Sequence, residues 1–241
     1  MSFLQHHIEF TAFILIFLGA FVQTAIGFGL AVVASPLLFM VDPDYVPSAV
    51  TLMALILSLM NAIKFKANIA IGGLKNALVW RIPGSVIGGG LLLYVSKDVL
   101  SLWLGGLVLF AVAVSFLPFR VEPTPKRMGI AGFFSGFFGT SSGIGGPPMA
   151  LLLQHQEANQ LRGNLAAFFV FSSLISLVVQ FFVGYFTWHH VLISLPLIPA
   201  TVIGYIFAIK FTSSLDKKKV RYGALTLCLL SGVTSIVNGL F

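Results

Sequence analysis

The segment GFFGTSSGIGGPPMALLL, residues 136–153, places five glycines, three hydroxyl residues and two adjacent prolines inside an apolar run. Backbone that leaves helical pairing at membrane depth must be buried in protein or line a polar cavity. Glycine permits tight turns and close approach of a ligand, and proline suits the first turn of a new helix. The segment therefore predicts a turn over 139–147 and a second helix that begins near Pro147.

The composition places this segment in a membrane protein. The chain has 241 residues, of which 58% are hydrophobic and 9% charged, and its mean hydropathy is +1.01. A soluble domain carries about 25% charged residues. The net charge of +7 falls in short joints between apolar runs, which indicates membrane topology and no nucleic-acid partner. The apolar runs cover 10–41, 46–63, 74–96, 99–118, 128–153, 163–187, 189–211 and 222–241.

The chain partly matches itself when it is shifted by 116 residues, which carries position 24 to 140. Thr24, Gly27 and Gly29 fall on Thr140, Gly143 and Gly145, and IPGSVIG (82–88) falls on IPATVIG (198–204). A constant offset across separate segments indicates a duplication within one integral membrane domain. Repeat 1 is predicted over 1–119, as a hairpin over 10–41 plus spans 46–63, 74–96 and 99–118. Repeat 2 is predicted over 120–241, as a hairpin over 128–153 plus spans 163–187, 189–211 and 222–241.

The distribution of Lys and Arg residues predicts whether the run 128–153 crosses the membrane or returns to the side from which it entered. If all eight runs cross the membrane, the Lys and Arg residues divide seven against seven. If 128–153 returns to its own side, thirteen lie on one side and only Lys97 on the other. The positive-inside rule favours the second arrangement, with loops 64–75, 120–127, 154–162 and 210–221 cytoplasmic.

The run 128–153 is therefore predicted to be a re-entrant hairpin whose arms, of about 10–12 residues, each reach half of a 30 Å core. By the repeat, the run 10–41 forms a similar hairpin that turns near 24–29. Each half then crosses the membrane an odd number of times, so the second half is inverted relative to the first. The predicted fold is an all-α polytopic membrane protein with two inverted-topology repeats, each a Gly-rich hairpin plus three transmembrane helices.

The two turns predict a substrate site, because helix N-termini and free glycine amides favour anions. Ser48 and Asn164 open the spans after the hairpins, where lining the site is one interpretation and helix capping or helix packing is an equally good one. Arg81 and Arg162 lie near the cytoplasmic ends of predicted spans. They could attract anions into a cytoplasmic vestibule, but the favoured interpretation is that their side chains snorkel to the membrane surface and anchor the topology. The substrate-binding residues predicted in the turns are Gln23, Thr24, Gly27, Gly29, Thr140, Ser141, Ser142, Gly143, Gly145 and Gly146.

The positions of the Asp and Glu residues limit the kinds of substrate that the predicted site could bind. All seven Asp and Glu residues lie in joints or at run ends, so no carboxylate is expected at mid-membrane. This argues against a carboxylate-based cation pump and agrees with an anionic substrate. No His/Cys ligand set, paired carboxylates or activated nucleophile is present, so the sequence predicts no enzyme, no cofactor and no metal. Other membrane glycines, namely Gly88, Gly89, Gly90, Gly105, Gly106 and Gly204, are expected to serve close helix packing.

The motifs GFGLAVVASPLL (27–38) and GTSSGIGGPPMALLL (139–153) resemble those of the TauE/SafE family of sulfite exporters and sulfonate permeases. The resemblance covers essentially the whole chain. It implies a multi-pass carrier in the bacterial inner membrane that moves a small sulfur-containing anion, such as sulfite or a sulfonate, by alternating access. A passive anion channel, a carrier of another small organic anion and a non-transporting partner subunit stay open as alternatives. The exact substrate, the direction of transport, coupling to protons and a homodimeric state also stay open, and membrane lipid is the expected surrounding.

Overall fold

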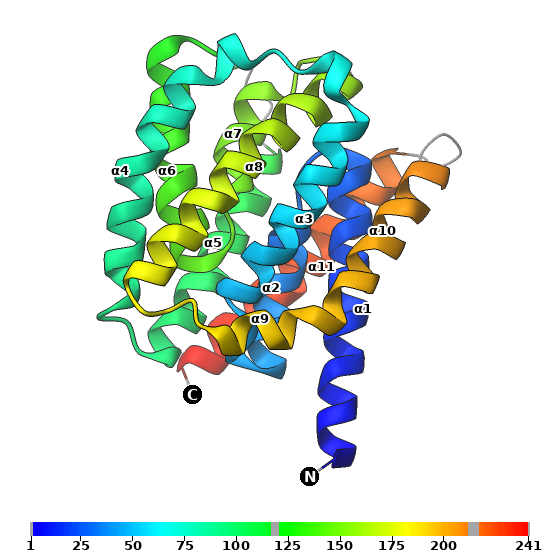
Figure 1. Cartoon of the computed structure of the whole chain (residues 1–241), viewed down its shortest axis with the longest axis vertical. Helices are drawn as coiled ribbons and strands as arrows, with labels where there is room; N and C mark the ends of the chain where they lie inside the picture. The colour runs from blue at the N-terminus through cyan, green and yellow to red at the C-terminus, as the bar shows by residue number, and fades with distance from the viewer. Residues whose placement is uncertain (1, 117–120, 212–216, 241) are drawn as a thin grey trace.

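The computed structural model of the chain describes residues 2–116, 121–211 and 217–240, and all regular structure within them is helical. The predicted repeat boundary at 119–120 and residues 212–216 of the predicted loop 210–221 lie outside the described residues. The helices are α1 Ser2–Ile26, α2 Leu30–Val41, α3 Ser48–Lys64, α4 Lys75–Leu92, α5 Lys97–Phe116, α6 Pro125–Ser142, α7 Gly146–Leu153, α8 Ala158–Phe182, α9 Trp188–Ser194, α10 Ile198–Phe211 and α11 Lys217–Leu240 (Figure 1).

Both glycine-rich runs are broken where the sequence predicts a turn. The first break separates α1 from α2, and the second separates α6 from α7. Three break residues have positive φ: Gly27 at 101°, Gly29 at 131° and Gly143 at 79°. Residues with a Cβ are strained in that region, so glycine is what allows the chain to turn there. The predicted turns at 24–29 and 139–147 are thus confirmed.

The predicted length of about 10–12 residues for each arm of the run 128–153 is wrong. α6 has 18 residues and α7 has 8, while α1 has 25 and α2 has 12. At 1.5 Å per residue α6 is about 27 Å long and α7 about 12 Å. The glycines before Gly143 do not end α6, because they lie in a helix face against which α4 packs. The first arm is therefore long and the second is short. The break lies about 27 Å from the outer end of the first arm and only about 12 Å from that of the second.

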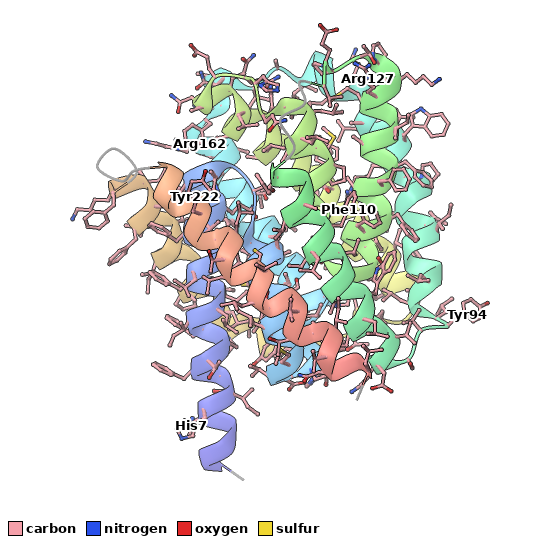
Figure 2. The ribbon with its side chains drawn as sticks, turned by 180° about the vertical axis from the view of Figure 1, so that it is seen from behind. His7, Tyr94, Phe110, Arg127, Arg162 and Tyr222 are labelled. Carbon is pink, nitrogen blue, oxygen red and sulfur yellow. The ribbon has the colours of Figure 1, made fainter. Side chains whose placement is uncertain are left out.

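The run 128–153 enters the helical bundle and returns to the same end. Figure 2 shows Arg127, at the start of α6, and Arg162, near the start of α8, toward one end of the molecule. Tyr94 and His7 lie at the opposite end (Figure 2). The chain thus comes back toward the end of the bundle at which α6 begins, and its return to the same side of the membrane stays a prediction.

Close helix pairs join the two halves of the chain. α4 packs along α6, α1 along α10, α5 along α11 and α3 along α8, so each pair takes one helix from before residue 117 and one from after residue 120. The α4–α6 pair is visible at one side of the bundle in Figure 1. The two glycine-rich hairpins therefore each lie against a helix from the other half.

Glycines set the separation of α4 and α6. A Cβ on Gly84 would lie 2.0 Å from the Phe133 carbonyl oxygen, and one on Gly132 would lie 2.1 Å from that of Ala77. Gly88 and Gly136 repeat this pattern one turn further along each helix, which makes two small-xxx-small faces. The two backbones touch directly, with no side chains between them.

The predicted packing glycines divide into two groups. Added Cβ atoms at Gly88, Gly89, Gly105 and Gly204 would lie within 2.8 Å of a neighbouring helix, which confirms the prediction for these positions. At Gly90 and Gly106 an added Cβ would meet nothing within 4 Å, so the prediction is wrong for this pair.

The outer surface suits a lipid environment. Four helical stretches are long and apolar enough to span a membrane, namely His6–Ile26, Ala158–Phe182, Trp188–Phe211 and Tyr222–Leu240. Large apolar side chains such as Phe182, Trp188 and Ile63 are exposed on the outside of the bundle. This confirms an all-helical, multi-pass membrane protein.

Candidate functional site

Arg81 lies inside the protein, beside the break between α6 and α7. Its side chain is only 1% exposed. Two glycines of α6 make room for it, since an added Cβ at Gly139 would lie 2.8 Å from the Arg81 Nη2 and one at Gly136 would lie 3.1 Å from its Cγ. The close glycine packing of α4 on α6 thus brings a cationic side chain to the second break.

The Arg81 guanidinium is held by neutral groups. Its Nη1 donates to Ser135 Oγ at 2.9 Å, and its Nη2 donates to Ser176 Oγ at 3.0 Å and to the Ser172 carbonyl oxygen at 3.1 Å. The guanidinium carbon also lies 5.6 Å from the centre of the Phe168 ring. Its Nε has no hydrogen-bond partner among the described residues. One donor on a buried cation is therefore left unused.

No carboxylate compensates this charge within the described part of the chain. The ion pairs there join Asp44 to Lys97 and to His189, and none of them involves Arg81. A buried charge without an opposite charge is strongly unfavourable unless a ligand supplies one. The favoured interpretation of Arg81 as a snorkelling anchor is wrong, because the side chain is buried and α6 and α8 hold the guanidinium.

A cavity of about 40 Å³ lies beside Arg81 and between the two breaks. Wall residues come from both breaks and from the middle of α8, so the cavity is where the two halves of the chain meet. The two breaks also approach each other directly, because an added Cβ on Gly146 would lie 3.4 Å from Phe28 Cβ. The residues predicted for the site that line this cavity are Gln23, Gly29, Gly143, Gly145 and Gly146, together with Arg81.

The hydroxyl residues of the second break point elsewhere. Ser141 Oγ donates to the Phe137 carbonyl oxygen and accepts from the Trp103 indole, while Ser142 Oγ donates to the Phe138 carbonyl oxygen. Serine in a helix commonly bonds the carbonyl four residues earlier, which turns the hydroxyl away from a ligand. Thr140 lies one layer behind the cavity, since its Oγ1 is 2.9 Å from Ser176 Oγ. Neither these serines nor Thr140 lines the cavity.

The polar residues of the first break are largely used in structure. Gln23 Oε1 accepts from the Leu30 amide at 3.1 Å and so caps the start of α2. Thr24 Oγ1 accepts from Asn61 Nδ2 at 3.2 Å. Gly27 faces Arg162 and Leu165 rather than the cavity. The first break therefore offers the cavity Gly29 and one edge of Gln23.

The remaining predicted residues do not reach the cavity. Ser48 Oγ donates to Gln180 Oε1 at 3.1 Å, and Asn164 joins the Ala70 amide to Gln156. Arg162 donates to the Ala25 carbonyl oxygen, where a cation at the end of α1 is favourable. These bonds link Ser48 and Asn164 to other segments, which agrees with the packing interpretation, and neither side chain caps its own helix.

Sequence reasoning missed the serines around Arg81. Ser135, Ser172, Ser173 and Ser176 are all buried; Ser135 binds Arg81 from α6, and the other three line the cavity from α8. The spacing of Ser172 and Ser176 was a usable signal, because residues four apart share one face of a helix. In an otherwise apolar span, two hydroxyls on one face indicate a polar neighbour. Nothing near Ser135 in the sequence points to Arg81.

Ser135 joins Arg81 to the second break, and its replacement is expected to lower the stability of the folded protein. Its Oγ accepts from Arg81 and donates to the Gly145 carbonyl oxygen. The change Ser135→Ala leaves both groups buried without this partner, which should cost about 2 kcal/mol and lower the thermal midpoint by about 5 °C. Thermal unfolding of the detergent-purified protein measures the shift.

Ser85→Ala is the matched control for this prediction. Ser85 is also buried, on α4, but its Oγ has no hydrogen-bond partner among the described residues. Its removal should leave the midpoint unchanged or raise it slightly. Equal midpoints for the two variants would show that the Ser135 bridge adds no stability.

In the described part of the chain no group of three or more His, Cys, Asp or Glu side chains could hold a metal ion. Neither the curated proteins nor the solved structures provided a match to the chain. The family model described as sulfite exporter TauE/SafE matches residues 12–235. With two broken helices around a buried arginine and a family match over nearly its whole length, the chain belongs to the TauE/SafE sulfite exporter family and is a membrane transporter rather than an enzyme.

Proposed function

We propose that this protein is a secondary transporter that binds one small sulfur oxyanion, such as sulfite or a sulfonate, at Arg81. The observation that carries the proposal is the buried Arg81 guanidinium, which has an unused donor and no carboxylate partner in the described residues. It borders a cavity between the two helix breaks. A bound anion would compensate the buried charge that lies beside that cavity.

Arginine suits this class of ligand. Its planar guanidinium donates several hydrogen bonds in a fixed fork and matches the oxygens of an oxyanion. The hydroxyls of Ser173 and Ser176 and the chain around Gly145 surround the same space and can contribute further polar contacts. α7 begins at Gly146, and Pro147 and Pro148 supply no N–H groups, so the amides available from its first turn are few. The binding energy would therefore come mainly from Arg81, with the glycines keeping the cavity open.

Transport would follow from two inverted repeats that move against each other. The 116-residue shift carries the break at 27–29 onto that at 143–145, and α4 with α6 onto α10 with α1. It also exchanges α3 with α8 and α5 with α11, which are the other close pairs. This packing is what a pseudo-two-fold arrangement requires, and it supports alternating access at the cavity between the halves.

The proposed orientation places the ends with loops 64–75, 120–127, 154–162 and 210–221 in the cytoplasm. Single cysteines can test it in a Cys228→Ala background, because Lys66, Glu157 and Tyr94 are all exposed. Lys66→Cys and Glu157→Cys should react only with a cytoplasmic thiol reagent, and Tyr94→Cys only with an external one. Labelling of the first two variants from opposite sides would contradict the return path of residues 128–153.

The proposed activity is tested with the purified protein in proteoliposomes. Sulfite, thiosulfate, sulfate, methanesulfonate, acetate and chloride are applied in turn, and substrate-induced charge movement is recorded. Saturable signals for sulfur oxyanions, with cross-competition between them, are the expected result. Currents that do not saturate and that include chloride would instead identify a passive anion channel. Saturation by acetate alone would identify a carrier of another organic anion.

A further inference from the structure

Two residues that the 116-residue shift brings into correspondence each bond the opposite half of the chain. The shift carries Ser48 onto Asn164, and each lies at or near the start of the helix that follows a hairpin. Ser48 Oγ donates to Gln180 Oε1 at 3.1 Å, and Asn164 Oδ1 accepts from the Ala70 amide at 2.7 Å. Both side chains are buried. One kind of polar link between the two halves therefore occurs twice.

The two links lie at opposite ends of α8. Asn164 is near the beginning of this helix and Gln180 is near its end, so at 1.5 Å per residue about 24 Å of helix separates them. Ser172, Ser173 and Ser176, which line the cavity beside Arg81, lie between these two positions. Along α8, the cavity thus has one link to the first half of the chain on each side.

Further contacts support the link at Asn164. Arg162, on the preceding turn of α8, donates from Nε to the Ala25 carbonyl oxygen at 3.2 Å, at the end of α1. Its guanidinium carbon lies 5.7 Å from the centre of the Phe65 ring, directly after α3. The beginning of α8 is therefore held to several segments of the first half, whereas its end is held mainly by the bond to Ser48.

We infer that these links are the two gates of the transporter. The outer link, from Ser48 to Gln180, closes the cavity toward the outside, and the inner link, from Asn164 to Ala70 with the support of Arg162, closes it toward the cytoplasm. The inference rests on the proposed function, in which the two repeats move against each other and expose the cavity to one side at a time. Such a movement separates the halves at one end, so the link at that end must break while the other holds. A few hydrogen bonds contribute modestly to stability, so they can break and form again in each cycle.

Access to the cavity from each side is measured with a cysteine at position 173, which lines it from α8. Ser173→Cys is made in the Cys228→Ala background of the full chain, and its reaction with a membrane-impermeant thiol reagent is followed in vesicles of known orientation. Ser48→Ala removes the outer link and should raise the reaction rate from the outside by about fivefold. Asn164→Ala removes the inner link and should raise the rate from the cytoplasmic side by about the same factor.

Ser101→Ala is the matched control for these variants. Ser101 Oγ donates to the Ser235 carbonyl oxygen at 2.9 Å, so it also joins the two halves through a buried hydroxyl, but it does not line the cavity and is not on α8. Its loss should lower the thermal midpoint and leave the labelling rate from both sides unchanged. A rate increase equal to that of Ser48→Ala would show that any loosened contact between the halves admits the reagent, and the assignment of gates would be wrong.

The outcomes separate this inference from the proposed function. An increase confined to the outside for Ser48→Ala and to the cytoplasmic side for Asn164→Ala supports the two gates; Arg162→Ala replaces the second variant if that one does not fold, with the same expectation. Folded variants that show no increase, or an increase from the opposite side, overturn the gates alone if the unaltered protein still transports sulfur oxyanions. If labelling is specific to one side for each variant but no sulfur oxyanion is transported, the gates stand and the proposed substrate is wrong.

Discussion

Arg81→Gln is expected to abolish binding of sulfur oxyanions, with an affinity loss of about 100-fold or more. Glutamine keeps a donor near Ser135 and Ser176 but removes the positive charge that the described structure leaves unpaired. Without that charge a bound anion would be buried uncompensated. Binding is measured as the substrate-induced rise in thermal midpoint and as saturable flux in proteoliposomes.

Stability of the anion-free protein separates a binding role from a structural one. Removal of an uncompensated buried charge relieves an unfavourable term, so the midpoint of Arg81→Gln without substrate should stay unchanged or rise. A supporting arginine would give the opposite result, with a lower midpoint and partial flux. Arg81→Lys keeps the charge but loses the planar fork, and it should retain weakened, still saturable binding.

Arg127→Gln is the matched control for this prediction. Arg127 is exposed at the start of α6, where it donates to the Glu122 carbonyl oxygen. The same loss of one positive charge there should change neither affinity nor midpoint by a measurable amount. If Arg81→Gln transports sulfite as the unaltered protein does, the proposed site is wrong.

Gly84→Ala is expected to be one of the most destabilising single-methyl additions in the protein. Its Cβ would lie 2.0 Å from the Phe133 carbonyl oxygen and 2.8 Å from the carbonyl carbon. Backbone cannot move aside as a flexible side chain can, so α4 and α6 must separate. The cost should be about 3 kcal/mol, which corresponds to a thermal midpoint about 10 °C lower.

Separation of these helices should also affect the site. Gly136 packs against the Arg81 backbone one turn from Gly84, so movement of α4 shifts the guanidinium relative to the second break. Any Gly84→Ala protein that remains folded should bind sulfite more weakly. Fluorescence-detected size exclusion reports the folded fraction, and proteoliposome flux reports the binding.

Gly90→Ala, on the same helix, is the control for packing. An added Cβ there meets nothing within 4 Å, and alanine favours the helical conformation over glycine. Its midpoint should be equal to that of the unaltered protein or slightly higher. A similar loss for both variants would mean that α4 tolerates no alanine, and the direct backbone contact would not be the cause.

The sequence by itself determined the class of protein and the places where helices break, and it predicts an anionic substrate. Long apolar runs can be stable only as membrane helices, and breaks near Gly27, Gly29 and Gly143 follow from local backbone freedom. The lack of mid-membrane carboxylates argues against a carboxylate-based cation pump without reference to any contact. These properties depend on residues that are close in the chain.

Tertiary structure alone decided which residues surround the cavity. Arg81 resembles a surface anchor in its local sequence, and it becomes buried only because Gly136 and Gly139, far along the chain, admit its side chain. Ser141 and Ser142, which looked like ligands, bond the carbonyls of their own helix. Burial and hydrogen-bond direction are properties of helix packing, so a single sequence without its fold cannot specify them.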